Sequence, residues 1–286
     1  MTTSEACSWH VAGFMSKKFD AVLLKVDIAK AFDSVAWPFL LEALQHIGFP
    51  RRWIDWISLL LSTSSTKVIL NGRPGNRITH ARGLRQGDPI SPMLFVIVME
   101  SLNSVFKEAD RRGVLSPLPE RAISNRTSMY ADDVVLLVAP TRKDLQGVQQ
   151  ILLLFAGASG LITNIDKCVV SPIRCTDDQL AEVQGVFPCV PTPFPCKYLG
   201  IPLSIGRLRC AEKQAIVDKV AARIPTWKSG LLNHAGRALL VKVTLSAIPV
   251  HVSIACCLSA WGIRQIDKRR RAFSLGRIRL SSWWSM

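Results

Sequence analysis

The sequence lacks the cysteine and histidine spacings that mark zinc-binding proteins. Its eight cysteines include no Cys-x-x-Cys pair, and no histidines stand at zinc-finger spacing. The N-terminus does not read as a secretory signal peptide, so we expect reduced thiols in an intracellular protein. Internal repeats and low-complexity tracts are also missing from the sequence, which argues against a repeat architecture.

Acidic residues are scarce in the last third of the chain. Residues 197–286 hold 16 Lys and Arg but only three acids, a net charge of +13, whereas residues 1–196 hold 20 basic and 18 acidic residues, a net charge of +2. Because phosphate contacts dominate nucleic-acid affinity, this basic part predicts a nucleic-acid partner. A membrane surface or a solubilising face would also explain the charge. The basic run at 268–271 is either a solvated face or a nuclear localisation patch.

One segment is long and uncharged enough to raise the question of a membrane. Residues 243–263 contain no Asp, Glu, Lys or Arg, but they include Pro249, His251 and four hydroxyl side chains. Hydrocarbon is a poor environment for these groups. We therefore expect a buried helix-turn-helix and no membrane partner. The length of 286 residues and the apolar fraction of 49% allow a substantial core.

Paired carboxylates stand between two apolar runs at residues 128–139. The pattern predicts a β-hairpin with Asp132 and Asp133 at its tip. A turn needs at most one Asp for its own hydrogen bonds, and two adjacent carboxylates repel each other unless a cation lies between them. Mg²⁺ binds through one or two carboxylates plus substrate phosphates. The alternative is a solvated Asp-Asp turn.

A third acid ends a predicted buried strand. Residues 21–28 are β-branched and aliphatic apart from Lys25 and Asp27. Asp27 is poorly hydrated at that position and needs a partner or a metal. Together with Asp132 it supplies the minimal set for two-metal phosphoryl transfer, in which one ion activates a hydroxyl and the other stabilises the leaving pyrophosphate. Asp33 precedes Pro38, and we expect it to cap the next helix.

Six segments, in order from about residue 20 to 273, resemble motifs of one family. They are similar to reverse transcriptases of non-LTR retrotransposons, plant LINE-type elements in particular. The segments are the first catalytic motif at 25–35, the template- and nucleotide-contacting motif at 83–92, the Tyr-Ala-Asp-Asp hairpin at 130–133, the lysine-bearing motif at 160–167, the primer-side strand at 197–203, and a helical region that includes Trp227, 234–240 and 248–249.

The resemblance implies a catalytic set of Asp27, Asp132, Asp133 and Lys167. It gives the metal-ligand role to the three carboxylates and to the backbone carbonyl of Ile28, with two Mg²⁺ ions as cofactors and Mn²⁺ as a possible substitute. Lys167 would donate a proton to the leaving pyrophosphate. An ordinary surface lysine is the alternative reading.

Nucleotide and template contacts are implied for Phe32, Arg85, Gln86, Gly87 and Tyr130. Phe32 would lie against the sugar and collide with a 2′-hydroxyl; otherwise it is a core aromatic. Arg85 and Gln86 would supply donors toward phosphate and base, where glycines allow close backbone approach. The alternative is an ordinary loop in which Asp88 caps a helix and Pro89 occupies its first position.

The order of elements predicts an α+β fold with helices on one face of an antiparallel sheet. It is similar to a polymerase palm followed by a helical thumb. The expected domains are a remnant of fingers at 1–20, a palm-like catalytic domain at 21–204, a helical thumb-like region at 205–273 and a divergent tail at 274–286. Within them we expect helices at 37–48, 51–61, 90–105, 142–158 (capped by Thr141), from 177, and at 208–223, 234–248 and 259–272. Further strands are expected at 66–70, 77–82, 161–171 and 197–202.

The implied function is an RNA-directed DNA polymerase, a reverse transcriptase that adds dNTPs to a DNA primer on an RNA template. Only 26 residues precede Asp27 in this sequence, so we expect the chain to carry little of the family's fingers region. The alternative is therefore a truncated, inactive retrotransposon relic that at most binds nucleic acid.

Overall fold

The computed structural model describes residues 20–118, 126–203, 214, 217, 218, 222, 232–246 and 260–276. These residues divide into two compact units. The first extends to Phe194 and the second begins at Pro195. The expected domain boundaries at 20/21, 204/205 and 273/274 stay predictions.

The first unit is built on a four-stranded sheet in the order β4-β5-β1-β6. Its strands are β1 (Ala21–Val26), β4 (Thr127–Tyr130), β5 (Asp133–Val138) and β6 (Val169–Ile173). β1 pairs antiparallel with both β5 and β6, and β5 pairs antiparallel with β4. The strand that precedes Asp27 therefore lies in the middle of the sheet, directly beside the predicted hairpin.

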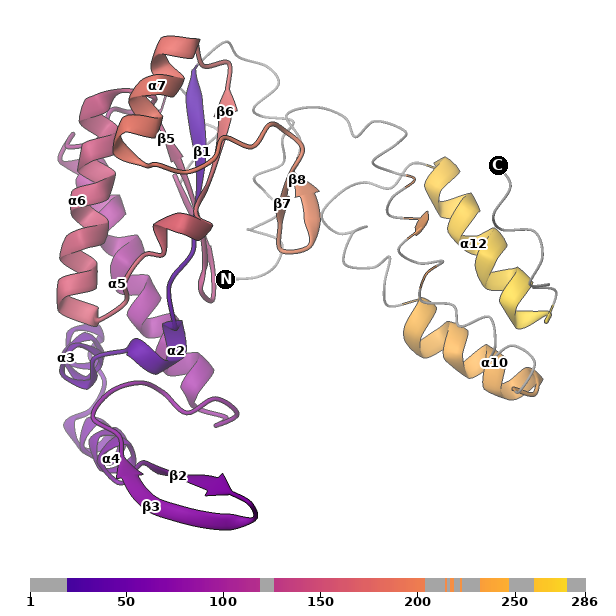
Figure 1. Cartoon of the computed structure of the whole chain (residues 1–286), viewed down its shortest axis with the longest axis horizontal. Coiled ribbons are helices and arrows are strands. Elements are labelled where there is room, and N and C mark those ends of the chain that lie inside the picture. The colour runs from indigo at the N-terminus through magenta and orange to yellow at the C-terminus, as the bar shows by residue number, and fades with distance from the viewer. Residues whose placement is uncertain are drawn as a thin grey trace. The chain divides into compact units, whose positions relative to one another are not determined.

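Helices cover one face of this sheet (Figure 1). The first unit contains α2 (Ala31–Ser34), α3 (Trp37–Ile47), α4 (Arg51–Ser62), α5 (Ser91–Arg111), α6 (Arg142–Ser159) and α7 (Asp177–Val186). Alternate residues of β1 (Val22, Leu24 and Val26) share one core with buried side chains of α3, α5 and α6. The α+β class with helices on one face of an antiparallel sheet is confirmed.

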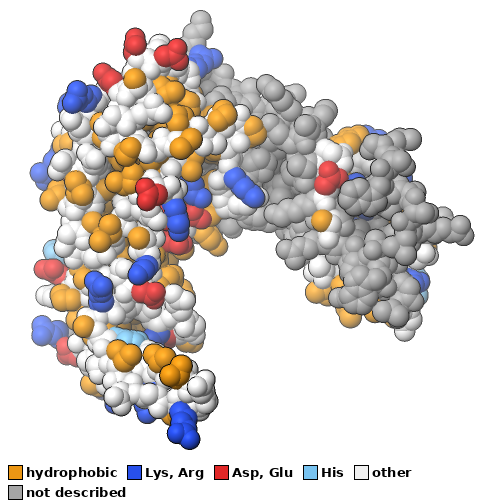
Figure 2. Space-filling view, viewed as in Figure 1, with side chains coloured by type: hydrophobic (Ala, Val, Ile, Leu, Met, Phe, Trp, Pro, Cys, Tyr) orange, Lys and Arg blue, Asp and Glu red, His pale blue; other side chains and the backbone are white. Residues whose placement is uncertain are grey.

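A second hairpin follows α4. It consists of β2 (Ser65–Leu70) and β3 (Arg73–Thr79), and nearly all of its residues are exposed. Figure 2 shows hydrophobic side chains at this end of the unit, where Ile69 and Leu70 are exposed. The expected strand at 77–82 was placed too late. Asn71 and Gly72 both adopt positive φ, so the turn closes in two residues and the chain is extended again from Arg73.

Two further boundaries differ from expectation. α5 begins at Ser91 with Pro92 in its first turn, so Pro89 is not the first helical residue. The expected strand at 161–171 is interrupted by a 3-10 turn, η1 (Ile165–Lys167), after a single bridge between Thr163 and Ile28. Asn and Asp side chains within 164–166 favour such local turns over a continuous ladder. The cap of α6 by Thr141 is confirmed.

The second unit contains β7 (Cys196–Tyr198), β8 (Ile201–Leu203), α10 (His234–Leu240), a π-helical turn η2 (Val241–Leu245) and α12 (Ala260–Ser274). β7 and β8 form a hairpin where one strand was expected, because Leu199 and Gly200 turn the chain at positive φ. Leu245 of η2 and Phe273 of α12 are fully buried and belong to one small hydrophobic core. Most of the expected helix at 208–223, with Trp227 and 248–249, lies outside the described residues. Within the described part, no helix has the length and apolar character to cross a bilayer.

Candidate active site

Asp27 lies directly beyond β1, opposite the catalytic hairpin predicted from the sequence. Val26 pairs with Val134, and the continued antiparallel register brings Asp27 opposite Asp133. The backbone on the other side is also held, since the Asn164 amide donates to the Asp27 carbonyl at 2.8 Å. Asp27 therefore occupies a fixed position between two neighbouring segments, with its side chain 36% exposed.

The other two acids stand at the tip of the β4–β5 hairpin. Tyr130 and Asp133 form the last strand pair, and Ala131 and Asp132 make the turn. Ala131 has a φ of +52°, a left-handed conformation that costs an L-residue about 1–2 kcal/mol. Tyr130 and Asp132 are exposed. The predicted hairpin is confirmed, and its tip presents a phenol and a carboxylate to solvent.

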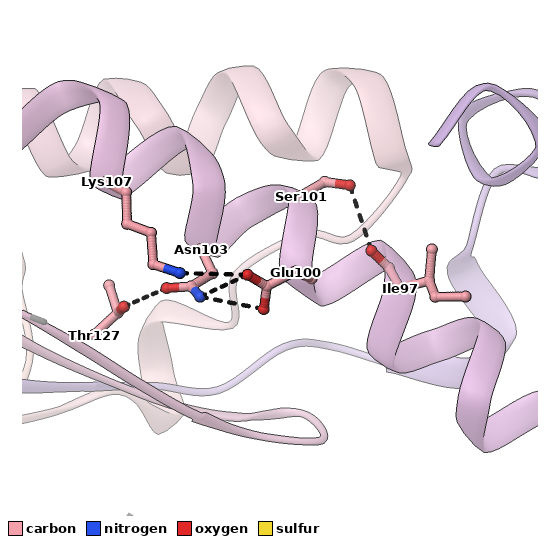
Figure 3. A network of polar contacts seen from close by, with 6 residues as sticks. All are labelled: Ile97, Glu100, Ser101, Asn103, Lys107 and Thr127. Atoms are coloured by element: carbon pink, nitrogen blue, oxygen red, sulfur yellow. Dashed lines mark hydrogen bonds and ion pairs between the residues drawn. The ribbon is translucent and has the colours of Figure 1, made fainter. Parts of the chain in front are cut away.

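The hairpin is fixed to the helical layer by a buried polar contact (Figure 3). The Thr127 hydroxyl on β4 donates to the side-chain oxygen of Asn103 on α5 at 2.6 Å. The Asn103 amide in turn donates to both carboxylate oxygens of Glu100, at 3.0 and 3.2 Å, and Lys107 contacts the same carboxylate at 3.4 Å. Since buried polar groups stabilise only when paired, this chain of contacts sets the position of β4 against α5.

The acids face away from the helices. Val22, Leu24 and Val26 point into the helical core, so Lys25 and Asp27 occupy the opposite face of the alternating strand. On that face the Lys25 ammonium lies 3.0 Å from Asp133, and the Lys167 ammonium lies 3.8 Å from Asp27. Sequence reasoning gave Lys25 no role, although it is the one charged residue of β1.

The donor set suits a hard divalent cation. Carboxylate oxygens and a backbone carbonyl are the ligands that Mg²⁺ prefers, and two of the acids here already contact a cationic ammonium group. Among the described residues, however, no three Asp, Glu, His or Cys side chains converge closely enough to hold a metal by themselves. Since Mg²⁺ commonly takes only one or two carboxylates and completes its shell with water and substrate phosphate, this arrangement fits an ion whose shell is completed by water or by a nucleotide phosphate.

The loop that carries the predicted nucleotide contacts packs onto the segment after Asp27. The Gly83 amide donates to the Val35 carbonyl at 2.8 Å, and the Leu84 amide donates to the Phe32 carbonyl at 2.6 Å. A Cβ on Gly83 would lie 2.6 Å from the Asp33 carbonyl oxygen. Only glycine allows backbone approach this close at a φ of +84°.

This packing brings some of the predicted nucleotide-binding residues together. The Gln86 amide donates to Asp33 at 3.3 Å. Asp33 lies inside α2 and Ala36 precedes α3, so the expectation that Asp33 caps the next helix is wrong. Phe32 stacks on Phe95 of α5 with ring centroids 4.7 Å apart, yet it stays partly exposed.

The remaining residues of this loop point outward. Arg85 and Gly87 are exposed. The Asp88 carboxylate accepts from the Ile90 amide at 3.1 Å, one residue before α5 begins. Asp88 therefore supports the approach to the helix but is not the cap that one reading of the sequence expected, because α5 has Ile90 at the N-cap position and no side-chain cap. Arg85 and Gln86 stay accessible to a ligand.

The segment with Lys167 meets the same region from the other side. Ser159 accepts from the Ala36 amide at 2.8 Å, and Gly160 packs against the Ser34 carbonyl at a φ of +78°. Beneath Lys167, burial raises the pKa of the Cys168 thiol, and burial with the nearby Cys168 raises the pKa of Cys189 to about 11. The raised pKa values disfavour the thiolate form at neutral pH, so neither thiol is an activated nucleophile.

Comparisons with known proteins agree with this geometry. Residues 3–203 match the family model described as reverse transcriptase (RNA-dependent DNA polymerase). The chain is 30% identical over 208 residues to the Pol polyprotein of retrotransposable element R2DM from Drosophila melanogaster, covering 69% of this chain and 19% of that protein. It is 27% identical over 238 residues to a 149 kDa protein of transposon TX1 from Xenopus laevis, covering 76% of this chain and 16% of that protein.

Solved structures show the same fold at low identity. Telomerase from Candida tropicalis, solved with a fragment of telomeric RNA, matches with a TM-score of 0.54 at 12% identity, over 96% of this chain and 43% of that one. Telomerase from Candida albicans matches with a TM-score of 0.50 at 11% identity, over 95% and 47% of the two chains. The chain spans one fifth or less of the retrotransposon proteins above. It belongs to the reverse transcriptase family and, within it, is similar to the non-LTR retrotransposon members of the R2 and TX1 kind.

Proposed function

We propose that this chain is the catalytic region of an RNA-directed DNA polymerase from a non-LTR retrotransposon of the plant LINE type. One observation carries the proposal: Asp27 and the Asp132–Asp133 pair come from distant parts of the chain and stand at the facing ends of β1 and the β4–β5 hairpin. A stable sheet has no need of three carboxylates there.

The carboxylates of Asp27 and Asp132 would hold the metal ions, with Asp133 beside them and the Ile28 carbonyl as a further oxygen donor. Bound Mg²⁺ or Mn²⁺ supplies activation of the primer 3′-hydroxyl and charge stabilisation of the leaving pyrophosphate. The backbone contact from Asn164 to Asp27 fixes one ligand. The contact from Asn103 to Thr127 fixes the hairpin that carries the others.

Lys167 and Phe32 would act on the incoming dNTP. The Lys167 side chain is 68% exposed beside Asp27, where it can follow the pyrophosphate and donate a proton to it. Phe32 is supported from below by Phe95, so its free edge can lie against the sugar and collide with a 2′-hydroxyl. The accessible Arg85 and Gln86 side chains are charged and amide donors suited to phosphate and base.

The proposed partners are an RNA template, a DNA primer and dNTPs. The net charge of +13 over residues 197–286 supports duplex binding through phosphate contacts. We place the protein inside the cell, where dNTPs are available, and leave the nucleus as the further possibility that the run at 268–271 raises. The second candidate function is an inactive relic that binds nucleic acid only.

Primer extension on a poly(rA)–oligo(dT) duplex with Mg²⁺ separates the two candidates. We expect dTTP incorporation that Asp27→Asn or Asp132→Asn abolishes. Asp55→Asn is the matched control, because Asp55 is an exposed carboxylate on α4 that pairs with Arg51 at 3.4 Å, far along the chain from the three acids. Salt-sensitive duplex binding without any incorporation would instead support the relic.

A further inference from the structure

Lys25 makes the closest ion pair of the catalytic face, and we propose that it is a positioning residue. It holds Asp133 as a charge-neutral pair, so that Asp27 and Asp132 are the two carboxylates left to bind metal. This inference rests on the proposed polymerase function. It divides the three acids of the site into two metal ligands and one anchored neighbour.

The geometry of the pair follows from the sheet. Lys25 pairs with Val135 across the β1–β5 ladder, so Asp133 is its diagonal neighbour, two residues away on the same face. Diagonal neighbours are within reach of a long side chain. The Nζ–Oδ1 distance is 3.0 Å, and the two side chains are only 30% and 37% exposed. Both ends of the contact are therefore mounted on paired strands rather than on loops.

The contact between Lys167 and Asp27 is of a different kind. Its distance is 3.8 Å, the Lys167 side chain is 68% exposed, and it extends from a 3-10 turn rather than a strand. Exposed ion pairs of this length contribute little and are easily exchanged. A metal ion can therefore displace Lys167 from Asp27 more readily than it can displace Lys25 from Asp133.

The charges of the site support the same division. Three carboxylates against Lys25 and Lys167 leave one net negative charge, which draws cations in without forcing three like charges together. If Lys25 were neutral, Asp133 would be free beside Asp27 and would compete for the ion. Lys25 thus limits the number of carboxylates that a bound ion can recruit.

A double-variant experiment tests the assignment through binding of Mn²⁺ alone, measured by calorimetry and electron paramagnetic resonance. Lys25→Met combined with Asp133→Asn removes the pair as a neutral unit. We expect its Mn²⁺ affinity to stay within about 3-fold of the wild type. Asp27→Asn and Asp132→Asn should each weaken binding at least about 10-fold, since even outer-shell partners of a metal are worth about 10- to 100-fold.

Two single variants complete the cycle. Lys25→Met alone should tighten Mn²⁺ binding, because it frees a carboxylate and removes a positive charge, whereas Lys25→Arg should restore the wild-type affinity. Arg51→Met is the control for loss of a cation that pairs with an acid elsewhere, because Arg51 lies on α4, 3.4 Å from Asp55. Melting curves of every variant report folding.

The proposal is overturned if the double variant loses as much Mn²⁺ affinity as Asp27→Asn, because Asp133 would then be a ligand itself. It is equally overturned if the folded wild type binds no Mn²⁺. Because these measurements use neither primer nor nucleotide, a chain that binds Mn²⁺ as expected but fails to extend a primer would refute the polymerase function and leave the role of Lys25 standing.

Discussion

The contact between Gly83 and the segment after Asp27 allows a sharp test of how the nucleotide loop is held. In Gly83→Ala the new Cβ would lie 2.6 Å from the Asp33 carbonyl oxygen and 2.9 Å from its carbonyl carbon. Both are backbone atoms, so no side chain can rotate away. Gly87→Ala is the matched control. Gly87 has a φ of +90°, similar to the +84° of Gly83, but nothing lies within 4 Å of its Cβ position.

The difference between the two variants isolates the steric effect. In each variant the left-handed backbone conformation destabilises the alanine by about 1–2 kcal/mol. The lower conformational entropy of the unfolded chain offsets about 0.4–1 kcal/mol of this cost. Gly83→Ala adds overpacking of about 1–3 kcal/mol. If the loop moves away instead, the variant weakens the hydrogen bonds from Gly83 to Val35 and from Leu84 to Phe32, each worth about 1 kcal/mol. We expect about 1 kcal/mol of destabilisation for Gly87→Ala and about 2–4 kcal/mol for Gly83→Ala.

Urea unfolding followed by circular dichroism measures both values, with the slope m as a check that the same surface unfolds. A difference of about 1–3 kcal/mol between the two variants supports the close backbone contact. If the two variants unfold within about 0.5 kcal/mol of each other, the range of an ordinary surface substitution, Gly83 does not touch Asp33 and the reasoning fails.

Three further outcomes follow from single contacts. Asn103→Leu should lower the free energy of unfolding in urea by about 2–3 kcal/mol, because it leaves the buried Thr127 hydroxyl unpaired. Adding Thr127→Val to this variant should recover part of the lost stability. No recovery would contradict the hydrogen bond between the two side chains. Thr141→Ala should cost about 1–2 kcal/mol, because Thr141 caps α6 and donates to the buried Asp144; a change near zero would contradict the cap. The Cys189 thiol, with its pKa raised from 9.0 to about 11, should react with iodoacetamide at pH 8 about 100-fold more slowly in the folded protein than in urea. The raised pKa of Cys189 stabilises the folded state below pH 9, and this stabilisation is lost as the pH approaches 11. Cys189→Ala should therefore make the melting temperature fall less steeply at alkaline pH than in the wild type. An equally steep fall would refute the contribution of Cys189 to the pH dependence.

Local sequence chemistry predicted the elements that carry the acids. The apolar run that ends at Asp27 is β1, and the Tyr-Ala-Asp-Asp tip joins β4 to β5. Thr141 begins α6 as expected. These features depend on the conformational propensities and helix caps of residues close together in the sequence, so they can be predicted from the sequence alone. The errors fall at turns. The turn at Asn71-Gly72 is shorter than expected, so β3 begins earlier, whereas Leu199-Gly200 and the 3-10 turn before Cys168 interrupt runs that were expected to be extended.

Contacts between distant segments could not be read in the same way. Asp33 was expected to cap a helix, but Gln86 takes its carboxylate from 53 residues away. The sequence also left two readings of Phe32 open, and the structure contains part of each. The ring stacks on Phe95 as a core residue would, while it stays partly exposed, as contact with a sugar requires. A residue can thus serve the core and a ligand at once when only one face of its ring is packed.

The strand register decides whether the acids form a site at all. A slip of one residue between β1 and β5 would turn Lys25 and Asp27 into the helical core, where their charges would be unpaired. A slip of two residues would keep every apolar side chain on its own face, so hydrophobic burial would not disfavour it. It would nevertheless separate Asp27 from Asp133 by about 7 Å along the strand. The two-residue turn at Ala131–Asp132 and the Thr127–Asn103 hydrogen bond resist this second slip, because they fix β5 to β4 and β4 to α5. The polar anchor on α5 therefore determines the spacing of the acids, a task that the apolar pattern of the strands cannot perform.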